Sequence, residues 1–117
     1  MSHTPYHSAK TFDFKGLRIR ELTPPDTTFA SIAEILIPPG QGHRRARSTK
    51  SDKLYTCLSG EVIFELDDNE YSLVKGDVLT IPRTQWFAYK NMSTDSEALL
   101  FLIHVPPFDL NAEEFDA

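Results

Sequence analysis

The stretch EVIFELDDNEYSLVKGDVLTIPR, residues 61–83, decides the fold class of this chain. In its first run Val62, Phe64 and Leu66 occupy alternate positions, so they share one face of an extended strand. The DDNE segment that follows holds the Asp and Asn residues that accept the backbone angles of a tight turn. A second alternating run then leads to Gly76. We therefore predict a β-hairpin that ends at a glycine corner and continues into another strand.

Runs of the same kind lie on both sides of this stretch. They are LRIREL (17–22), TFASIAEILIPPG (28–40), DKLYTCLSG (52–60), WFAYKN (86–91) and EALLFLIHVPP (97–107). The segment FASIAEIL tolerates a helix by composition, but Pro38, Pro39 and Gly40 end it within the length of a strand. Short runs separated by turn residues predict an all-β sandwich or barrel.

Length and composition restrict the organisation of the chain. With 117 residues there is room for one domain, residues 1–117, and one closed core. Residues 1–12 are polar and unpatterned, and residues 110–117 are acidic, so we expect both ends to be loosely ordered.

Charge and cysteine content indicate the class of partner and the compartment. The net charge of -5 and the pI near 5.3 give no positive field for a nucleic acid or an anionic membrane. The single cysteine, Cys57, has no partner for an internal disulfide, which favours a cytoplasmic location. We find no secretory signal and no apolar run of membrane-spanning length.

Fixed intervals mark the stretches 40–60 and 76–91. In the first, Gly40 is followed by positions 46, 48 and 53 and by Gly60; in the second, Gly76 is followed by Pro82 and positions 84, 87 and 91. These intervals resemble the paired motifs of the cupin superfamily, whose first motif spaces a glycine, two histidines, a glutamate and a second glycine. The fifteen residues between the two motifs match the spacing of small, RmlC-like cupins. The resemblance extends over about residues 29–109.

The resemblance implies a cupin-type double-stranded β-helix, that is, a jelly-roll barrel. The apolar alternate positions of the strands would fill its interior; they are Val62, Phe64, Leu66, Tyr71, Leu73, Phe87 and Tyr89. Small cupins commonly pair through their N-terminal strands, so we expect a homodimer in which residues 17–22 and 28–37 supply the contact surface.

The residues at the motif positions depart from those of metal-binding cupins. In those proteins the two histidines, the glutamate and a last histidine hold a divalent ion, whereas here the positions hold Ala46, Ser48, Lys53 and Phe87. Two of these side chains have no ligand atom, and the lysine brings a positive charge to the place of the cation. We therefore expect no metal and no cofactor. A site rebuilt from other residues stays an alternative, with His43, Cys57, His104 and Asp109 as its candidates.

Lys53 is the strongest candidate for chemistry. If its strand keeps the parity of the family, its amine points into a pocket with aromatic neighbours. A lysine removed from water has a lowered pKa and can pair with a carboxylate, act as a general base or form a Schiff base. The alternative is a lysine at the barrel mouth with its amine in water.

Around Lys53 the segment HRRARSTKSDK, residues 43–53, is basic in an acidic chain. Strand alternation would turn Arg44 inward, where it could clamp a carboxylate or phosphate. It would turn Arg45 and Arg47 outward, toward solvent, the acidic tail or a second subunit.

The residues thus predict a site in the barrel with three candidate functions. The catalytic candidates are Lys53 and Tyr55, and the ligand-binding candidates are Arg44, Ala46, Ser48, Cys57, Phe64, Phe87, Tyr89 and His104. The first function is a metal-independent isomerase, cyclase or lyase that acts by proton transfer on a small organic, anionic metabolite. The resemblance to the cupin superfamily supports it, because the sugar epimerases of that superfamily work without a metal. The second is a non-catalytic binding or sensor protein. The third is a metal enzyme with relocated ligands.

Overall fold

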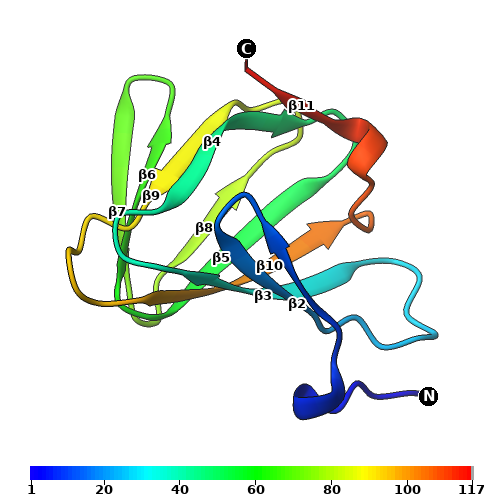
Figure 1. Ribbon diagram of the computed structural model, residues 1–117. Coiled ribbons are helices and arrows are strands. Elements are labelled where there is room, and N and C mark those ends of the chain that lie inside the picture. Colours follow the sequence, from blue (N-terminus) through cyan, green and yellow to red (C-terminus); the bar gives the residue numbers. More distant parts are fainter. Residues whose placement is uncertain (117) are drawn as a thin grey trace.

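The computed structural model describes residues 1–116, which form two antiparallel β-sheets packed face to face (Figure 1). One sheet has the strand order β1-β2-β3-β10-β5-β8 and the other the order β11-β4-β9-β6-β7. The strands are β1 (Thr11–Phe14), β2 (Leu17–Glu21), β3 (Ser31–Ile37), β4 (Gly42–Ser48), β5 (Asp52–Ser59), β6 (Glu61–Leu66), β7 (Asn69–Val74), β8 (Val78–Ile81), β9 (Phe87–Lys90), β10 (Ala98–Val105) and β11 (Glu113–Phe115). Two short 3-10 helices, η1 (Tyr6–Ser8) and η2 (Leu110–Ala112), complete the described elements. The predicted all-β jelly-roll barrel is confirmed.

The hairpin predicted from the sequence is formed by β6 and β7. Val62 faces Leu73 across it, and Phe64 faces Tyr71. Asp67 takes a φ of 54° at the tip, a conformation that Asp tolerates better than most residues. The alternation of the sequence therefore sets the register. The expectation that Tyr71 fills the interior is wrong: this residue is 43% exposed, because it lies on β7, the edge strand of its sheet.

Glycine is required at the corner between β5 and β6. Gly60 has a φ of 76°, and a Cβ built on it would lie 2.9 Å from the carbonyl oxygen of Glu97. No other residue fits this approach without a backbone shift.

The interior is formed by alternate residues of the central strands. In β5 the inward positions are 53, 55 and 57, and in β10 they are 98, 100, 102 and 104. The inward orientation of Lys53 expected from strand parity is therefore observed; Tyr55 and Cys57 point inward from the same strand, and each of the three residues is at most 3% exposed.

A β-bulge interrupts the alternation of β4. His43 faces Tyr89 and Ala46 faces Phe87, so three steps along β4 correspond to two along β9. His43 and Ala46 both point inward as a result, and Arg44 is exposed. The predicted inward orientation of Arg44 is wrong, because simple alternation does not continue through the extra residue.

Both chain ends contact other parts of the chain. At the N-terminus the Tyr6 hydroxyl donates to Glu34 at 2.7 Å, and the Arg20 guanidinium lies 4.1 Å from the Tyr6 ring centroid. At the C-terminus, β11 pairs with Ala46 to Ser48 of β4 and extends that sheet (Figure 1). Both segments thus have specific partners, while their expected loose order stays a prediction; residue 117 lies outside the described part.

Charge complementarity explains the contacts of the C-terminal segment. Arg45 binds Asp116 at 2.8 Å, Arg47 binds Glu114 at 2.7 Å, and Lys50 binds Asp109 at 3.3 Å. The basic segment thus receives the acidic tail, which was one of the alternatives for its outward arginines.

Over residues 1–116, no helix combines the length and the apolar character that crossing a membrane requires.

Candidate functional site

A cavity of about 190 Å³ opens between the two sheets at the end where β11 and the β1–β2 hairpin lie. Most of its wall is apolar, with Phe14, Leu17, Ile35, Leu102 and Phe115 among the contributors. The polar or ionisable side chains in this wall are Glu21, Ser31, His43, Lys53, Tyr55, Tyr89, His104 and Glu113. A mostly apolar pocket with a few convergent polar groups is typical of small-molecule sites.

Lys53 and Glu113 form an ion pair in the cavity wall. The Lys53 ammonium donates to Oε1 of Glu113 at 2.7 Å, and the two side chains are only 4% and 5% exposed. Burial lowers the pKa of Lys53, while the Glu113 charge and hydrogen bond oppose this shift. The alternative of a lysine with its amine in water at the barrel mouth is therefore wrong.

His43 enters the cavity because of the bulge in β4. Its Nδ1 lies 2.7 Å from the carbonyl oxygen of Arg44, which can only accept, so Nδ1 carries the hydrogen and Nε2 the free lone pair. Its ring packs against Phe87 and Tyr89, with centroids 5.3 and 5.4 Å away. Burial lowers the pKa of His43 to about 4, with the charge of Lys53 acting in the same direction. The imidazole is neutral at pH 7 and can accept a proton at Nε2.

His104 lies near the end of β10, directly opposite Lys53 in the pairing of β10 with β5. Burial and the Lys53 charge lower its pKa to about 3, so this ring is also neutral at pH 7. Its Nε2 is buried without a hydrogen-bond partner.

Tyr55 and Tyr89 supply two phenols, with ring centroids 5.6 Å apart. Burial raises the pKa of both, and the charges of Tyr89 and Glu113 add to the shift of Tyr55. Both hydroxyls therefore stay protonated at neutral pH and can donate hydrogen bonds. The hydroxyl of Tyr89 is buried and has no partner in the protein.

The structure brings some of the sequence-predicted site residues together in the cavity wall and separates others from it. Those in the wall are Lys53, Tyr55, Tyr89 and His104. Those packed in the adjoining core are Ala46, Cys57, Phe64 and Phe87, each at most 1% exposed. Burial raises the pKa of the Cys57 thiol, which suits a packing role.

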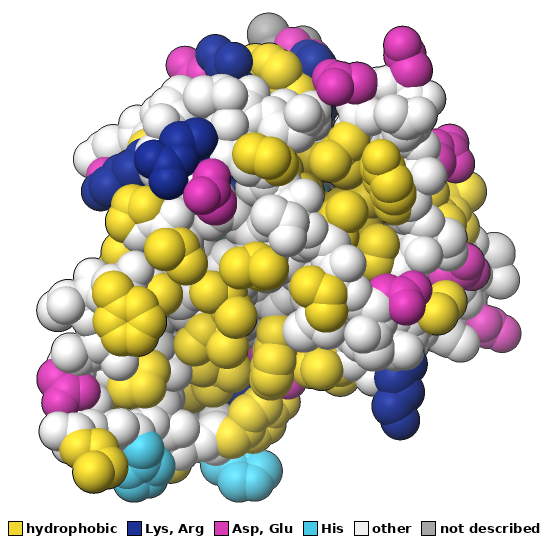
Figure 2. Space-filling model, turned by 180° about the vertical axis from the view of Figure 1, so that it is seen from behind, with side chains coloured by type: hydrophobic (Ala, Val, Ile, Leu, Met, Phe, Trp, Pro, Cys, Tyr) yellow, Lys and Arg dark blue, Asp and Glu magenta, His cyan; other side chains and the backbone are white. Residues whose placement is uncertain are grey.

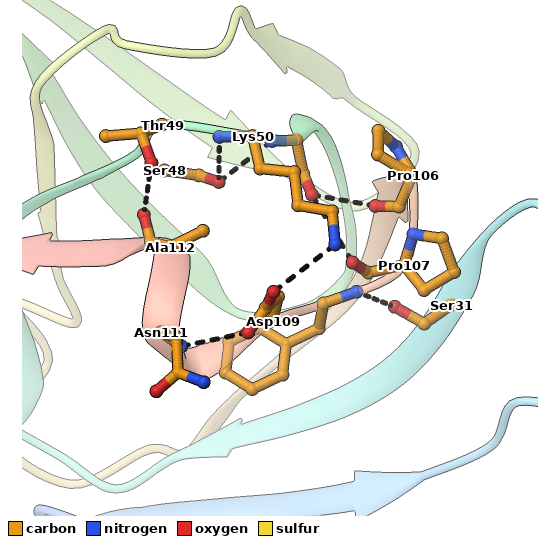
Figure 3. A network of polar contacts seen from close by, with 11 residues as sticks. Ser31, Ser48, Thr49, Lys50, Pro106, Pro107, Asp109, Asn111 and Ala112 are labelled. Carbon is orange, nitrogen blue, oxygen red and sulfur yellow. Dashed lines mark hydrogen bonds and ion pairs between the residues drawn. The ribbon is translucent and has the colours of Figure 1, made fainter.

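Ser48 and Arg44 have other partners. The Ser48 hydroxyl accepts from the backbone amides of Lys50 and Ser51, at 3.2 and 2.9 Å, and so fixes the turn between β4 and β5 (Figure 3). The Arg44 guanidinium lies outside, 4.8 Å from the Phe115 ring centroid. The expectation of an anionic ligand relied on the positive charges of Arg44 and Lys53. Arg44 lies outside the cavity and Lys53 is already paired with a carboxylate, so neither charge is free for a ligand.

Sequence reasoning missed two members of the site. His43 was considered only as a candidate metal ligand, because a bulge leaves no recognisable pattern in a single sequence. Glu113 was assigned to a loose tail. One signal in the sequence did indicate a partner for Glu113. The segment 43–53 is basic and the C-terminal segment is acidic, so the two could attract each other.

The residues at the motif positions do not fit a divalent cation. Lys53 places its ammonium 4.7 Å from the Phe87 ring centroid, beside a carboxylate that already balances its charge. Within residues 1–116 there is no group of three or more His, Cys, Asp or Glu side chains arranged to hold a metal ion.

Comparison with known proteins gives relatives at the level of family and of fold. The sequence model of the family described as "Cupin domain" matches residues 33–104. The uncharacterized protein MJ1618 of Methanocaldococcus jannaschii is 31% identical over 83 residues, which is 68% of this chain and 66% of that protein, just under two thirds of its length.

Two solved structures share the fold over nearly the whole chain. Streptomyces PAC13 with uridine superposes with a TM-score of 0.80 at 17% identity, over 97% of this chain and 89% of that chain. That protein is described as a nucleoside dehydratase, and its structures with uridine include variants with a histidine changed to glutamine or a tyrosine to phenylalanine. KdgF from Halomonas sp. superposes with a TM-score of 0.82 at 16% identity, over 93% of this chain and 96% of that chain. At these identities the likeness shows the fold alone.

Proposed function

Because this chain belongs to the cupin domain family, whose model matches residues 33–104, we propose that it binds a small organic molecule in its barrel and transfers protons on it without a metal. The reaction classes in question are those of an isomerase, a cyclase or a lyase. The observation that carries the proposal is the neutral His43 in the same cavity wall as the Lys53 ammonium. A buried base beside a fixed positive charge is suited to forming and stabilising an anion.

The proposed base is Nε2 of His43. It takes a proton from a carbon or hydroxyl of the bound molecule and becomes imidazolium, and the electron pair left behind moves onto an oxygen of that molecule. Lys53 has ammonium hydrogens beyond the one given to Glu113, and one of these donates to that oxygen. Return of the proton to a different atom completes an isomerisation. Transfer of the proton to a departing hydroxyl, which leaves as water, completes an elimination.

The two tyrosines complete the proposed acid–base set. Burial raises the pKa of Tyr55 and Tyr89, so their hydroxyls act as hydrogen-bond donors and short-range acids rather than as bases. A dehydratase is a lyase, so the description of the structurally similar PAC13 supports one of the three reaction classes.

The absence of a metal from the proposed mechanism rests on the donor set. At the glutamate position of the motif, Lys53 places a positive charge, paired with Glu113, where a divalent cation would bind. The other three motif positions offer the methyl group of Ala46, the ring of Phe87 and the hydroxyl of Ser48, which is hydrogen-bonded in a turn.

Deuterium exchange tests the proposal without a complete turnover assay. The protein is incubated in D2O with a panel of small hydroxy-carbonyl compounds, and NMR follows loss of carbon-bound hydrogen. We expect exchange into at least one compound with the wild type and a loss of about a hundredfold or more with His43→Gln or Lys53→Met, because general acid–base groups contribute roughly 10²–10⁴. Unchanged exchange in both variants contradicts the mechanism.

A binding protein without catalysis is the second candidate, and the mostly apolar cavity wall favours it. The two functions differ in the fate of the bound compound. A compound that raises the melting temperature and is recovered unaltered after long incubation supports binding alone. One that is recovered changed supports catalysis.

A further inference from the structure

Three buried polar atoms around the cavity have no hydrogen-bond partner: Oε2 of Glu113, Nε2 of His104 and the hydroxyl of Tyr89. Only two other side-chain atoms in residues 1–116 share this condition, on Thr4 and Arg20. Buried polar groups are normally hydrogen-bonded, and a carboxylate oxygen without a donor is the costliest of the three to leave unpaired. Their concentration in one cavity wall indicates a ligand that supplies the missing partners.

The chain itself neutralises the cation of the cavity. Lys53 is the one cation among the described cavity-lining residues, and its ammonium is bound to Glu113. His43 and His104 are neutral at pH 7, and Glu21 adds a second acid to the wall. A ligand carboxylate or phosphate would therefore meet Oε2 of Glu113 without a free cation to offset the repulsion.

Glu113 is held in position by its own segment. Asp109 accepts from the amide of Asn111 at 3.0 Å and binds Lys50, and the Thr49 hydroxyl donates to the carbonyl of Ala112 (Figure 3). Strand pairing then places Glu113 opposite Ser48. The carboxylate is therefore a preformed part of the site and does not depend on a ligand to order it.

We propose that the ligand of this cavity is an uncharged molecule with a hydroxyl or N–H group that donates to Oε2 of Glu113, and that Glu113 determines specificity by excluding anions. This inference uses the same cavity as the proposed function and names its ligand class. The aromatic wall suits a planar or ring-shaped molecule with polar edges, such as a nucleoside or an aromatic amide.

Matched probes that differ in charge test the proposal. The pairs are uridine with uridine 5′-monophosphate, and nicotinamide with nicotinate. Binding is measured by calorimetry and by ligand-observed NMR. For the wild type we expect at least one neutral member to bind about tenfold or more tightly than its anionic counterpart, since the anion meets the Glu113 carboxylate without a free cation beside it.

Three variants identify Glu113 as the cause. Glu113→Gln leaves Lys53 unpaired, and we expect the neutral-to-anion preference to fall by at least about tenfold. The double variant Lys53→Met with Glu113→Gln removes both charges, and we expect weak neutral binding without a gain for the anion. Glu114→Gln changes the adjacent exposed carboxylate, which faces Arg47, and should leave the preference unchanged.

The outcomes are decisive for the ligand class. Tighter binding of either anion by the wild type, failure of both neutral probes to bind, or an unchanged preference in Glu113→Gln overturns the proposal. Circular dichroism of each variant confirms that the barrel is retained, and the double variant keeps the test open if one single variant unfolds. A neutral probe that binds as expected but shows no hydrogen exchange defeats the proposed proton transfer and leaves the ligand class intact.

Discussion

The Lys53 ammonium lies 2.7 Å from Oε1 of Glu113, a residue 60 positions later in the sequence. This contact joins β5, one strand in from the edge of one sheet, to β11 at the edge of the other, inside the barrel. Both groups are almost completely buried, so each is the partner that offsets the cost of burying the other. The C-terminal strand is in this way part of the cavity wall.

Removing one partner of this pair should destabilise the fold more than removing both. Lys53→Met or Glu113→Gln alone leaves a buried unpaired group, and we expect each to lower the free energy of unfolding by about 3–5 kcal/mol. The double variant should lose clearly less than the sum of the two single losses. Urea unfolding measures all three, with the exposed Glu114→Gln as a control expected to change stability by under about 1 kcal/mol. Additive losses would refute the coupling.

The pH dependence of activity should report the lowered pKa of His43. The imidazole accepts protons freely above a pKa of about 4, so catalysis by this base should persist well below the ordinary histidine value of 6.5. The rate profile measures this directly. A loss of activity centred near pH 6.5 would show that His43 is not the base in its buried state.

The same lowered pKa affects stability with a definite sign. The unfolded chain binds a proton at His43 below pH 6.5, whereas the folded chain does so only near pH 4. The contribution to stability is therefore complete above pH 6.5 and is lost as the pH falls toward 4. Melting temperatures from pH 8 to 4 should decline less steeply in His43→Gln than in the wild type. Parallel curves would speak against a buried neutral His43.

Salt should loosen the outer contacts of the C-terminal segment while the buried Lys53–Glu113 contact holds. The exposed pairs Arg45–Asp116, Arg47–Glu114 and Lys50–Asp109 are screened at 1 M salt, where the Debye length is about 3 Å. The buried Lys53–Glu113 pair is not. We expect faster hydrogen exchange at the Asp116 amide, which donates to Arg45, and little change within β5. Equal acceleration in both places would mean that the exposed pairs do not anchor the strand.

Alanine should be less tolerated at Gly60 than at Gly76. Both glycines have positive φ values, 76° and 92°, so alanine strains the backbone at each by roughly 1–3 kcal/mol. At Gly60 the new Cβ also meets the Glu97 carbonyl, whereas at Gly76 it meets nothing within 4 Å. Thermal unfolding of the two variants separates strain from steric overlap. Equal losses would contradict the close approach at Gly60.

We propose that two copies associate through the sheet that contains β2 and β3. Six of the outward side chains of its central strands are apolar and only partly buried in the single chain, with Glu34 and Thr56 as polar neighbours on the same face; the six are Ile32, Leu36, Leu54, Leu99, Phe101 and Ile103. Hydrophobic side chains also gather over the face seen in Figure 2. Light scattering should give twice the chain mass of 13.3 kDa, and Phe101→Lys should reduce it. A monomeric wild type would exclude this surface as a stable interface.

The local pattern of the sequence was sufficient for the barrel and for half of the cavity. Alternation in the hairpin 61–74 and the glycine at 60 fixed strand faces and a corner, because the two-residue period of a strand and the freedom of glycine are properties of the chain segment itself. Strand parity also placed Lys53 on an inward position.

The remainder of the site depended on contacts between distant segments. A bulge against β9 exchanged the orientations of His43 and Arg44, and an acidic segment that looked like a tail brought Glu113 to Lys53. Neither feature can be recognised from the local sequence. A bulge exists only relative to the strand that pairs with it, and an ion pair between distant residues forms only after the chain has folded. The sequence by itself determined which strands face inward; only the tertiary structure decided which charges meet there, because desolvation and pairing act between groups that the chain keeps far apart until it folds.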